Sequence, residues 1–248
     1  MMKVVGGLAA LLAALGLWQA IVSLTDVPRF ILPPPALVFE TWVANRALLA
    51  EHTLATATEI ALGLLVGSVL GVATALALAA SELARVTVRP VLVFTQALPV
   101  FALAPILTLW LGFGLGSKIA MAVLIIYFPI TSAFFDGLMR TPPGFLDLAR
   151  TMGASRSSTL WHVRVPAALP ALGSGLRLAA VYAPIGAVIG EWVGSSQGLG
   201  YLMLLANGRA KTDLMFAALF TLGLLSIALY LAVNWATLAW LRRHTPGV

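Results

Sequence analysis

DLARTMGASRSSTLWHVRVP, residues 147–166, is the core of the longest polar interruption between two strongly apolar regions of the chain. Two prolines precede it, at 142 and 143, and proline is favoured in the first turn of a helix. Apolar residues then recur at helical spacing up to Gly153, which can end a helix by adopting a left-handed conformation. Ser155 can cap a second short helix. The stretch is therefore predicted to form two short helices joined at a glycine corner, with an apolar face and a basic face.

The composition sets the class of protein. Of the 248 residues, 60% are apolar and only 10% are charged, and the mean hydropathy is +0.99. A soluble domain carries about 25% charged residues. The chain has no cysteine, which excludes disulfides, thiolate chemistry and a cysteine-based metal site. These values predict a polytopic membrane protein, in which the side that carries the net charge of +6 matters more than its size.

Six apolar runs are long enough to cross about 30 Å of hydrocarbon as helices, so the fold is predicted to be all-α, with residues 1–248 forming one transmembrane domain. The first run is interpreted as a retained helix, because the apolar core of a secretory signal is usually about 7–15 residues long. The six spans are expected at about residues 4–24, 54–80, 88–112, 118–138, 169–191 and 214–241.

The connections between the spans are also predicted. Residues 36–50 could form a short helix on the membrane surface, residues 82–89 a short basic loop, and residues 191–213 a polar, glycine-containing loop. Pro99 and Pro105 are expected to kink the third span, because proline removes a backbone donor and clashes within a helix.

Small residues repeat at four-residue spacing in two of the spans. This pattern allows helices to approach closely in a membrane. The fifth span is expected to begin only after the prolines at 166 and 170, and Asp136 is expected to stop the fourth. The two predicted close-packing faces are Gly63, Gly67 and Gly71, and Gly186, Gly190 and Gly194.

The distribution of cations predicts the orientation. Six spans would put both termini on one side of the membrane, together with the loops at residues 82–89 and 136–168, and Arg177 is counted on that side. The positive-inside bias then places that side in the cytoplasm. Ten of the 15 cations belong to it: Lys3, Arg85, Arg89, Arg140, Arg150, Arg156, Arg164, Arg177, Arg242 and Arg243. The other five are Arg29, Arg46, Lys118, Arg209 and Lys211.

The polar segment at residues 142–166, which we call the coupling segment, resembles a motif of the inner-membrane permease subunits of ATP-binding-cassette (ABC) importers. That motif reads E-A-A, three residues, Gly, nine residues, I-x-L-P. The spacing matches throughout, although aspartate replaces glutamate and leucine replaces the first alanine. The corresponding residues are Asp147, Leu148 and Ala149, then Gly153, then Val163, Val165 and Pro166.

In the family this segment is a cytoplasmic coupling helix, here between spans four and five, that docks into a groove of the ATPase. The alternative is an ordinary amphipathic interfacial loop. The resemblance implies a docking face that comprises Phe145, Leu148, Met152 and Leu160, with Asp147 and Arg150 adding polar contacts.

The resemblance extends over most of the chain. Four stretches look like the nitrate, sulfonate and taurine importer permeases: TQALPVFALAP (95–105), LWLGFG (109–114), FPI (128–130) and LP (169–170). Three others look most like permeases assigned to a thiamine pyrimidine precursor: GEWVG (190–194), GLGY (198–201) and TDLMF (212–216). The implied assembly, in a bacterial inner membrane, contains two copies of this chain, two cytoplasmic ATPase subunits and an extracytoplasmic solute-binding protein.

Enzymatic functions receive little support. The three histidines are far apart in the sequence, and no paired-histidine metal motif or nucleophile elbow is present. GFGLGSK, residues 112–118, resembles a phosphate-binding loop but has Ser117 where glycine is required and Ile119 where serine or threonine is required. We therefore expect no catalytic residue, metal or cofactor in this chain, and ATP with Mg²⁺ is expected to act in the partner ATPase. A passive channel and a membrane assembly subunit remain alternative classes.

Four side chains are candidates for the permeant path: Glu191, Glu59, Tyr127 and Tyr182. An ionisable residue at the end of a membrane helix is a functional hypothesis by default, and the alternative for Glu191 is a solvated interfacial carboxylate. The two carboxylates would repel an anion, while Arg177 lies near the cytoplasmic end. This argument favours a neutral or weakly basic solute such as a hydroxymethyl-aminopyrimidine, and sulfonate, taurine or nitrate is the alternative.

Overall fold

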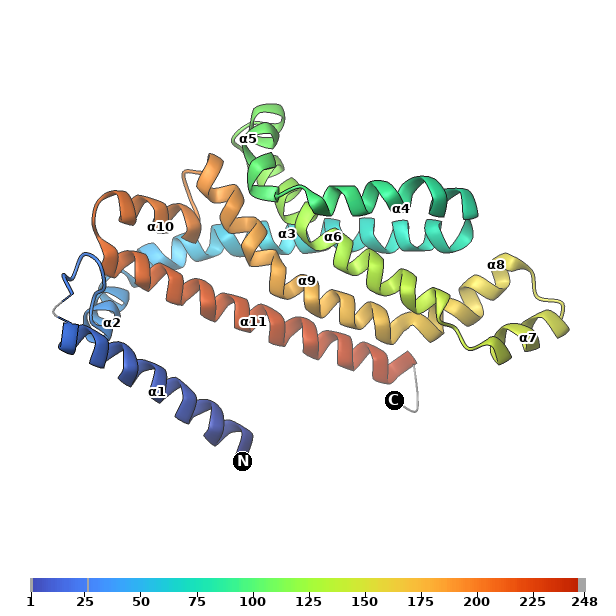
Figure 1. The fold of residues 1–248 in the computed structure, drawn as a ribbon, viewed down its shortest axis with the longest axis horizontal. Coiled ribbons are helices and arrows are strands. Elements are labelled where there is room, and N and C mark those ends of the chain that lie inside the picture. The colour runs from blue at the N-terminus through green and yellow to red at the C-terminus, as the bar shows by residue number, and fades with distance from the viewer. Residues whose placement is uncertain (1, 26, 245–248) are drawn as a thin grey trace.

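The computed structural model describes residues 2–25 and 27–244, and the regular elements in these ranges are helices (Figure 1). This confirms the all-α prediction. The helices are α1 Met2–Thr25, α2 Pro35–Ala44, α3 Arg46–Ala80, α4 Glu82–Ala97, α5 Val100–Leu111, α6 Leu115–Met139, α7 Pro143–Thr151, α8 Arg156–Thr159, a π-helical turn (η1) Leu160–Arg164, α9 Val165–Gly194, α10 Leu199–Gly208 and α11 Thr212–His244.

Four long helices, α3, α6, α9 and α11, run along the length of the molecule (Figure 1). The central helix α6 packs against both α3 and α9, and α11 packs against α9. At one end lie α2, α10 and the beginning of α11, and at the other end α7 and α8 project from the bundle (Figure 1). We call these the α10 end and the coupling end.

Glycines allow the close approach of these helices, as predicted. A Cβ added to Gly63 would lie 2.6 Å from the Cβ of Ala122, and one added to Gly67 would lie 2.7 Å from Ile126. A Cβ added to Gly186 of α9 would lie 2.6 Å from the Cα of the same alanine, Ala122. The two predicted glycine faces therefore allow α3 and α9 to pack closely on α6, and both helices meet it at Ala122.

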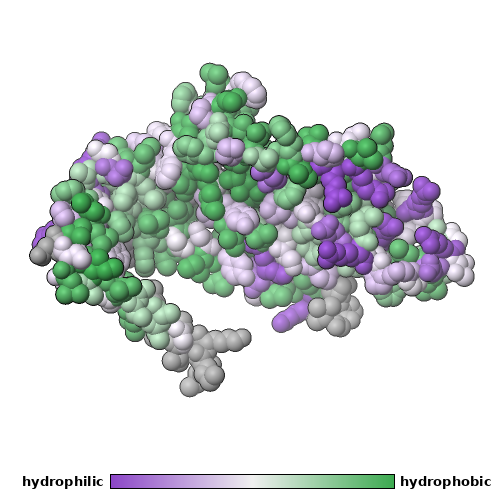
Figure 2. All heavy atoms as spheres, viewed as in Figure 1, coloured by the Kyte–Doolittle hydropathy of each residue, from purple (hydrophilic) through white to green (hydrophobic). Residues whose placement is uncertain are grey.

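Apolar side chains fill the bundle and also cover much of its surface. Ile126, Ile130 and Phe134 of α6 form the centre of the core and are at most 2% exposed. Outward-facing residues such as Trp235 of α11 remain 74% exposed, and green apolar surface covers much of the view in Figure 2. An apolar exterior of this extent is suited to lipid rather than to water.

Among residues 2–25 and 27–244, four helices are long and apolar enough to cross a membrane, or five if α4 and α5 form one broken span. These two helices meet at an angle of 103°. The break at Pro99 was predicted, and it follows from the extended backbone of Leu98, since a residue before proline disfavours the helical conformation. Pro105 stays inside α5 without a break. The count of six spans stays a prediction.

Several predicted helix boundaries are wrong. The helix that contains the second predicted span begins at Arg46, within the stretch 36–50 expected to form a short surface helix, and residues 82–89 are the first half of α4 rather than a loop. Asp136 lies inside α6, and α9 begins at Val165 and passes through Pro170. Helix propensity and tertiary packing outweigh single polar or proline residues at these sites. Residues 191–213, expected to be a loop, contain α10.

Candidate functional site

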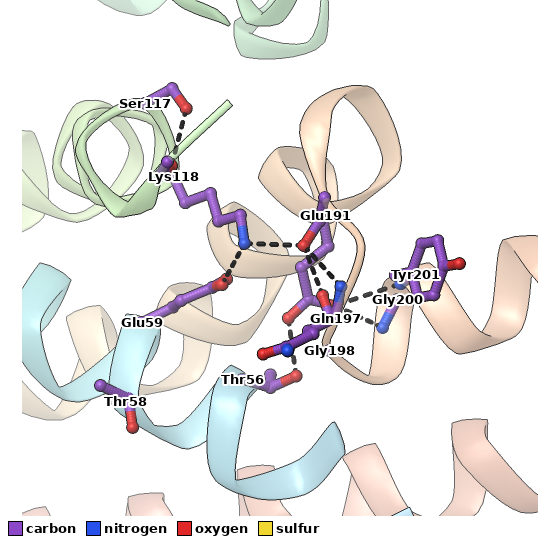
Figure 3. Close-up of polar contacts among 12 residues, drawn as sticks. Thr56, Thr58, Glu59, Ser117, Lys118, Glu191, Gln197, Gly198, Gly200 and Tyr201 are labelled. Carbon is purple, nitrogen blue, oxygen red and sulfur yellow. Dashed lines mark hydrogen bonds and ion pairs between the residues drawn. The ribbon is translucent and has the colours of Figure 1, made fainter. Parts of the chain in front are cut away.

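The side chain of Glu191, on the last turn of α9, is enclosed at the α10 end. It is 1% exposed and accepts hydrogen bonds from Thr56 Oγ1 of α3 at 2.6 Å and from the backbone N–H groups of Gly200 and Tyr201 (Figure 3). The N–H groups belong to the first turn of α10, whose positive dipole end favours a carboxylate. Thr56 Oγ1 also accepts from the N–H of Leu199 at 2.8 Å. This one carboxylate therefore ties α3, α9 and α10 together.

The backbone around Glu191 requires glycine. Gly198 has a φ of +110°, a conformation that L side chains rarely adopt, and an added Cβ would overlap the carboxyl group of Glu191. A Cβ on Gly200 would lie 2.8 Å from Glu191 Oε2. The N–H of Gly198 donates to Nδ1 of His52 at 3.0 Å. The GLG sequence at 198–200 thus forms a backbone cradle that fits one carboxylate.

A buried ion pair lies beside this cradle. Lys118 Nζ, in the first turn of α6, is 2.7 Å from Oε1 of Glu59 on α3, and the two side chains are 9% and 1% exposed. The same Nζ donates to Ser195 Oγ at 2.7 Å, in the connection between α9 and α10. Within the described part of the chain, Oε2 of Glu59 has no hydrogen-bond partner. We call the set Thr56, Glu59, Lys118, Glu191 and Ser195 the polar latch.

The polar latch corrects two predictions. Glu191 is not a solvated interfacial carboxylate, because it is buried and hydrogen-bonded. Lys118, expected to be a loop cation, lies inside α6 and pairs with Glu59, so the charge of Glu59 is not an uncompensated barrier to an anion. The sequence did contain one signal for this site. Lys118 begins the fourth apolar run at the same predicted depth as Glu59 and Glu191, although on a different span.

The two candidate tyrosines, Tyr127 and Tyr182, have different surroundings. Tyr127 donates from its hydroxyl to Thr74 Oγ1 of α3 at 3.3 Å and packs against the core. Tyr182 of α9 instead lines a cavity of about 580 Å³ beside the break between α4 and α5. We call this the α6 cavity. Its polar lining comes from Thr95, Gln96, Ser132 and Tyr182, and its apolar lining includes Phe128 and Leu178.

The coupling segment has the predicted local structure. Gly153, which follows the C-cap residue Met152 of α7, has a φ of +74°, and Ser155 Oγ accepts from the N–H of Ser158 at 3.2 Å as the cap of α8. α8 then continues through η1 into α9, so this short helix is joined without a break to a long membrane helix.

The predicted docking face is only partly assembled. Phe145, Leu148 and Met152 are 57%, 58% and 77% exposed, and they line a groove of about 670 Å³ with Val163 and Pro166, which we call the coupling groove. By contrast, Leu160 and Ala149 are buried, and Leu160 belongs to the core rather than to an exposed face. Asp147 and Arg150 are exposed and pair with each other at 3.0 Å.

The fold defines a polytopic helical membrane protein, and comparison with known proteins identifies its family. The binding-protein-dependent transport system inner membrane component family matches residues 63–244. The chain is 52% identical over 219 residues to a probable ABC transporter permease protein of Haemophilus influenzae, covering 88% of this chain and 89% of that protein.

Two further relatives have more specific names. The formylaminopyrimidine transport permease protein ThiX of Halalkalibacterium halodurans is 36% identical, covering 88% of this chain and 87% of that protein. The riboflavin transport system permease protein RibX of Chloroflexus aurantiacus is 39% identical, covering 89% and 83%. The inward-facing MetNI methionine ABC transporter contains a chain of the same fold, with a TM-score of 0.69 and 21% identity over 79% of this chain and 97% of that chain.

The chain therefore belongs to the family of binding-protein-dependent inner-membrane transport components, and it is a permease subunit of an ABC transporter. It is a multi-pass protein of the inner membrane and a transport subunit. Membership of this family generally implies an ATPase and a binding protein as partners.

Proposed function

We propose that this chain, as a homodimer with two cytoplasmic ATPase subunits, imports a small uncharged nitrogen heterocycle, such as a hydroxymethyl-aminopyrimidine, that an extracytoplasmic binding protein delivers. The termini and the coupling end face the cytoplasm in this proposal. Closure of the ATPase dimer moves the coupling segment, and the bundle then alternates between outward and inward access.

The lining of the α6 cavity is the main support for this choice of permeant. No charged side chain lines it in the described structure, whereas hydroxyl and amide groups lie beside Phe128 and the ring of Tyr182. Sites for small molecules are mostly apolar with a few placed polar groups. Such a lining can stack against a flat heteroaromatic ring and hydrogen-bond its edge, and it offers no cation to a sulfonate or to nitrate.

The relatives support the same chemical class. ThiX and RibX, named for a formylaminopyrimidine and for riboflavin, are 36% and 39% identical to this chain. TauC of Escherichia coli, named for taurine, is 28% identical over 98% of the chain. The carboxylates give this choice less support than the lining of the α6 cavity does, because Lys118 pairs with Glu59.

The test is uptake by proteoliposomes that contain the permease, its ATPase and its binding protein. Labelled hydroxymethyl-aminopyrimidine should accumulate with ATP, and excess taurine or nitrate should leave uptake unchanged. Tyr182→Leu and Gln96→Leu should each reduce uptake about tenfold. Tyr230→Leu is the matched control, because Tyr230 and Tyr182 are both 38% exposed but Tyr230 lies on α11, away from the α6 cavity.

Competition by taurine or nitrate, without response to the pyrimidine, would overturn the choice of permeant while leaving the transport function intact. Failure of the ATPase to copurify with the permease would count instead against the assembly.

A further inference from the structure

A separate cavity lies at the coupling end, between the turn that joins α3 to α4 and the coupling segment. It has a volume of about 920 Å³. One wall is the last turn of α3, residues 76–80, and the opposite wall comes from α7, α8 and η1. In Figure 2 hydrophilic residues gather at this end of the molecule, over the region of α4, α7 and α8 in Figure 1.

The cavity is strongly cationic. Four arginines line it, Arg85, Arg150, Arg156 and Arg164, against the single carboxylate of Glu82. Asp147 pairs with Arg150, but both side chains are more than two-thirds exposed, so solvent screens this pair. The charge of the lining therefore favours an anion.

Two of these guanidinium groups lack a strong partner. Nε of Arg85 is buried and makes no hydrogen bond to any residue that the structure describes. Nη1 of Arg164 is 3.9 Å from the sulfur of Met139, a weak acceptor. Guanidinium groups bind phosphate through paired N–H donors. A phosphate in the cavity would accept hydrogen bonds from the arginine N–H groups that line it.

The apolar part of the lining indicates where such a phosphate would come from. Residues 76–80 of α3 present leucine and alanine to the cavity, and Trp161, 54% exposed, stands at its margin. Beside Arg85, the α4 residues Leu83 and Val86 are 73% and 69% exposed, which suits contact with lipid. A ligand with both a phosphate and hydrocarbon fits this lining better than a free ion does.

We propose that this arginine cavity binds the phosphate group of an anionic phospholipid, whose acyl chains lie along α3 and α4. Basic pockets between membrane helices are known to hold lipid head groups. The bound lipid bridges Arg85 of α4 to the arginines of the coupling segment. It thereby holds that segment against the bundle, a role independent of which solute is transported.

The experiment is native mass spectrometry of the purified full-length permease with phosphatidylglycerol or phosphatidylcholine. We expect at least tenfold more retained phosphatidylglycerol than phosphatidylcholine. Arg85→Gln combined with Arg164→Gln should remove this preference. The matched control is Arg242→Gln with Arg243→Gln, which removes two exposed cations from the end of α11 and should keep it.

If the first double variant unfolds, Arg150→Gln with Arg156→Gln decides the question, because both side chains are exposed and their loss should not disturb the core. Equal retention of the two lipids by the unaltered protein would overturn the proposal, as would an equal loss in the control. Inorganic phosphate is tested separately by thermal shift. Stabilisation by phosphate that matches stabilisation by phosphatidylglycerol would assign the cavity to the free anion instead.

Discussion

The two ends of α9 differ in how they use polar and apolar side chains. At the α10 end, the buried carboxylate of Glu191 receives three hydrogen bonds from α3 and α10. At the coupling end, Phe145, Leu148 and Met152 are apolar but more than half exposed. A buried carboxylate that is hydrogen-bonded within the chain holds the surrounding helices in one arrangement, whereas an exposed apolar patch marks a surface that another molecule covers.

Because of this difference, the two ends should respond differently to mutation. Changes at the α10 end should act mainly through the stability of the bundle, because the polar latch connects four of its segments. Changes to the exposed side chains of α7 should act mainly through transport, because these side chains contribute little to the core. Three substitutions test this contrast.

The largest expected effect on stability is that of Gly198→Val. The added side chain would overlap the Glu191 carboxyl group, and valine would have to adopt a φ of +110°. Loss of the cradle together with backbone strain should lower the free energy of unfolding by more than about 4 kcal/mol, a range that single substitutions rarely reach. Thermal unfolding of the purified permease measures this, and accumulation in the membrane should fall as well.

Gly208→Val is the control for that substitution. Gly208 ends α10, close to the same site in sequence, but an added Cβ meets nothing within 4 Å. Its unfolding temperature should stay near that of the unaltered protein. A Gly198→Val protein as stable as this control would show that the cradle does not hold the α10 end together.

Much of the fold could be predicted because its signals are local. Apolar runs predicted the long helices, and glycines four residues apart predicted the faces that pack on α6. The corner at Gly153 and the cap at Ser155 also depend only on neighbouring residues. Exact helix ends were less predictable, because residues 82–89 and 199–208 are helical in spite of polar or glycine residues within them.

The polar latch could not be predicted from local patterns. Thr56 and Glu191 are separated by 135 residues, and Glu59 and Lys118 by 59. Each of these side chains looks alone like an isolated polar residue near the end of a span. Only the packing of α3, α6 and α9 at the same depth reveals that they complete one another. The α6 cavity likewise depends on the bend of 103° between α4 and α5, which proline locates but does not measure.

An intermediate effect on stability is expected for Lys118→Met. It leaves the carboxylate of Glu59, 1% exposed, without its cation. Removing one partner of a buried pair typically costs about 3 to 5 kcal/mol, because the other charge stays buried and unpaired. Thermal unfolding should show this loss, and Lys211→Met, at an exposed position, should show none.

A second variant identifies the cause of that loss. Lys118→Met combined with Glu59→Gln removes both charges, so it should recover at least half of the lost stability. If the double variant is as unstable as Lys118→Met alone, the buried pair does not explain the effect, and the bond from Lys118 to Ser195 becomes the better explanation.

The smallest effect on stability is expected at the coupling end, for Gly153→Val. The φ of +74° strains valine, but nothing lies within 4 Å of the added Cβ, so the cost should stay near about 1–2 kcal/mol. ATP-dependent uptake should nevertheless be lost, because a changed corner turns α7 and its apolar side chains away from the proposed ATPase groove. The purified permease should remain folded.

Gly144→Val, in the first turn of α7 with equally open surroundings, is the control and should keep uptake. Gly153→Asn should restore part of it, since asparagine tolerates the left-handed conformation. Normal uptake by Gly153→Val would show that the corner is not required for coupling, and a large loss of stability would remove the contrast between the two ends of α9.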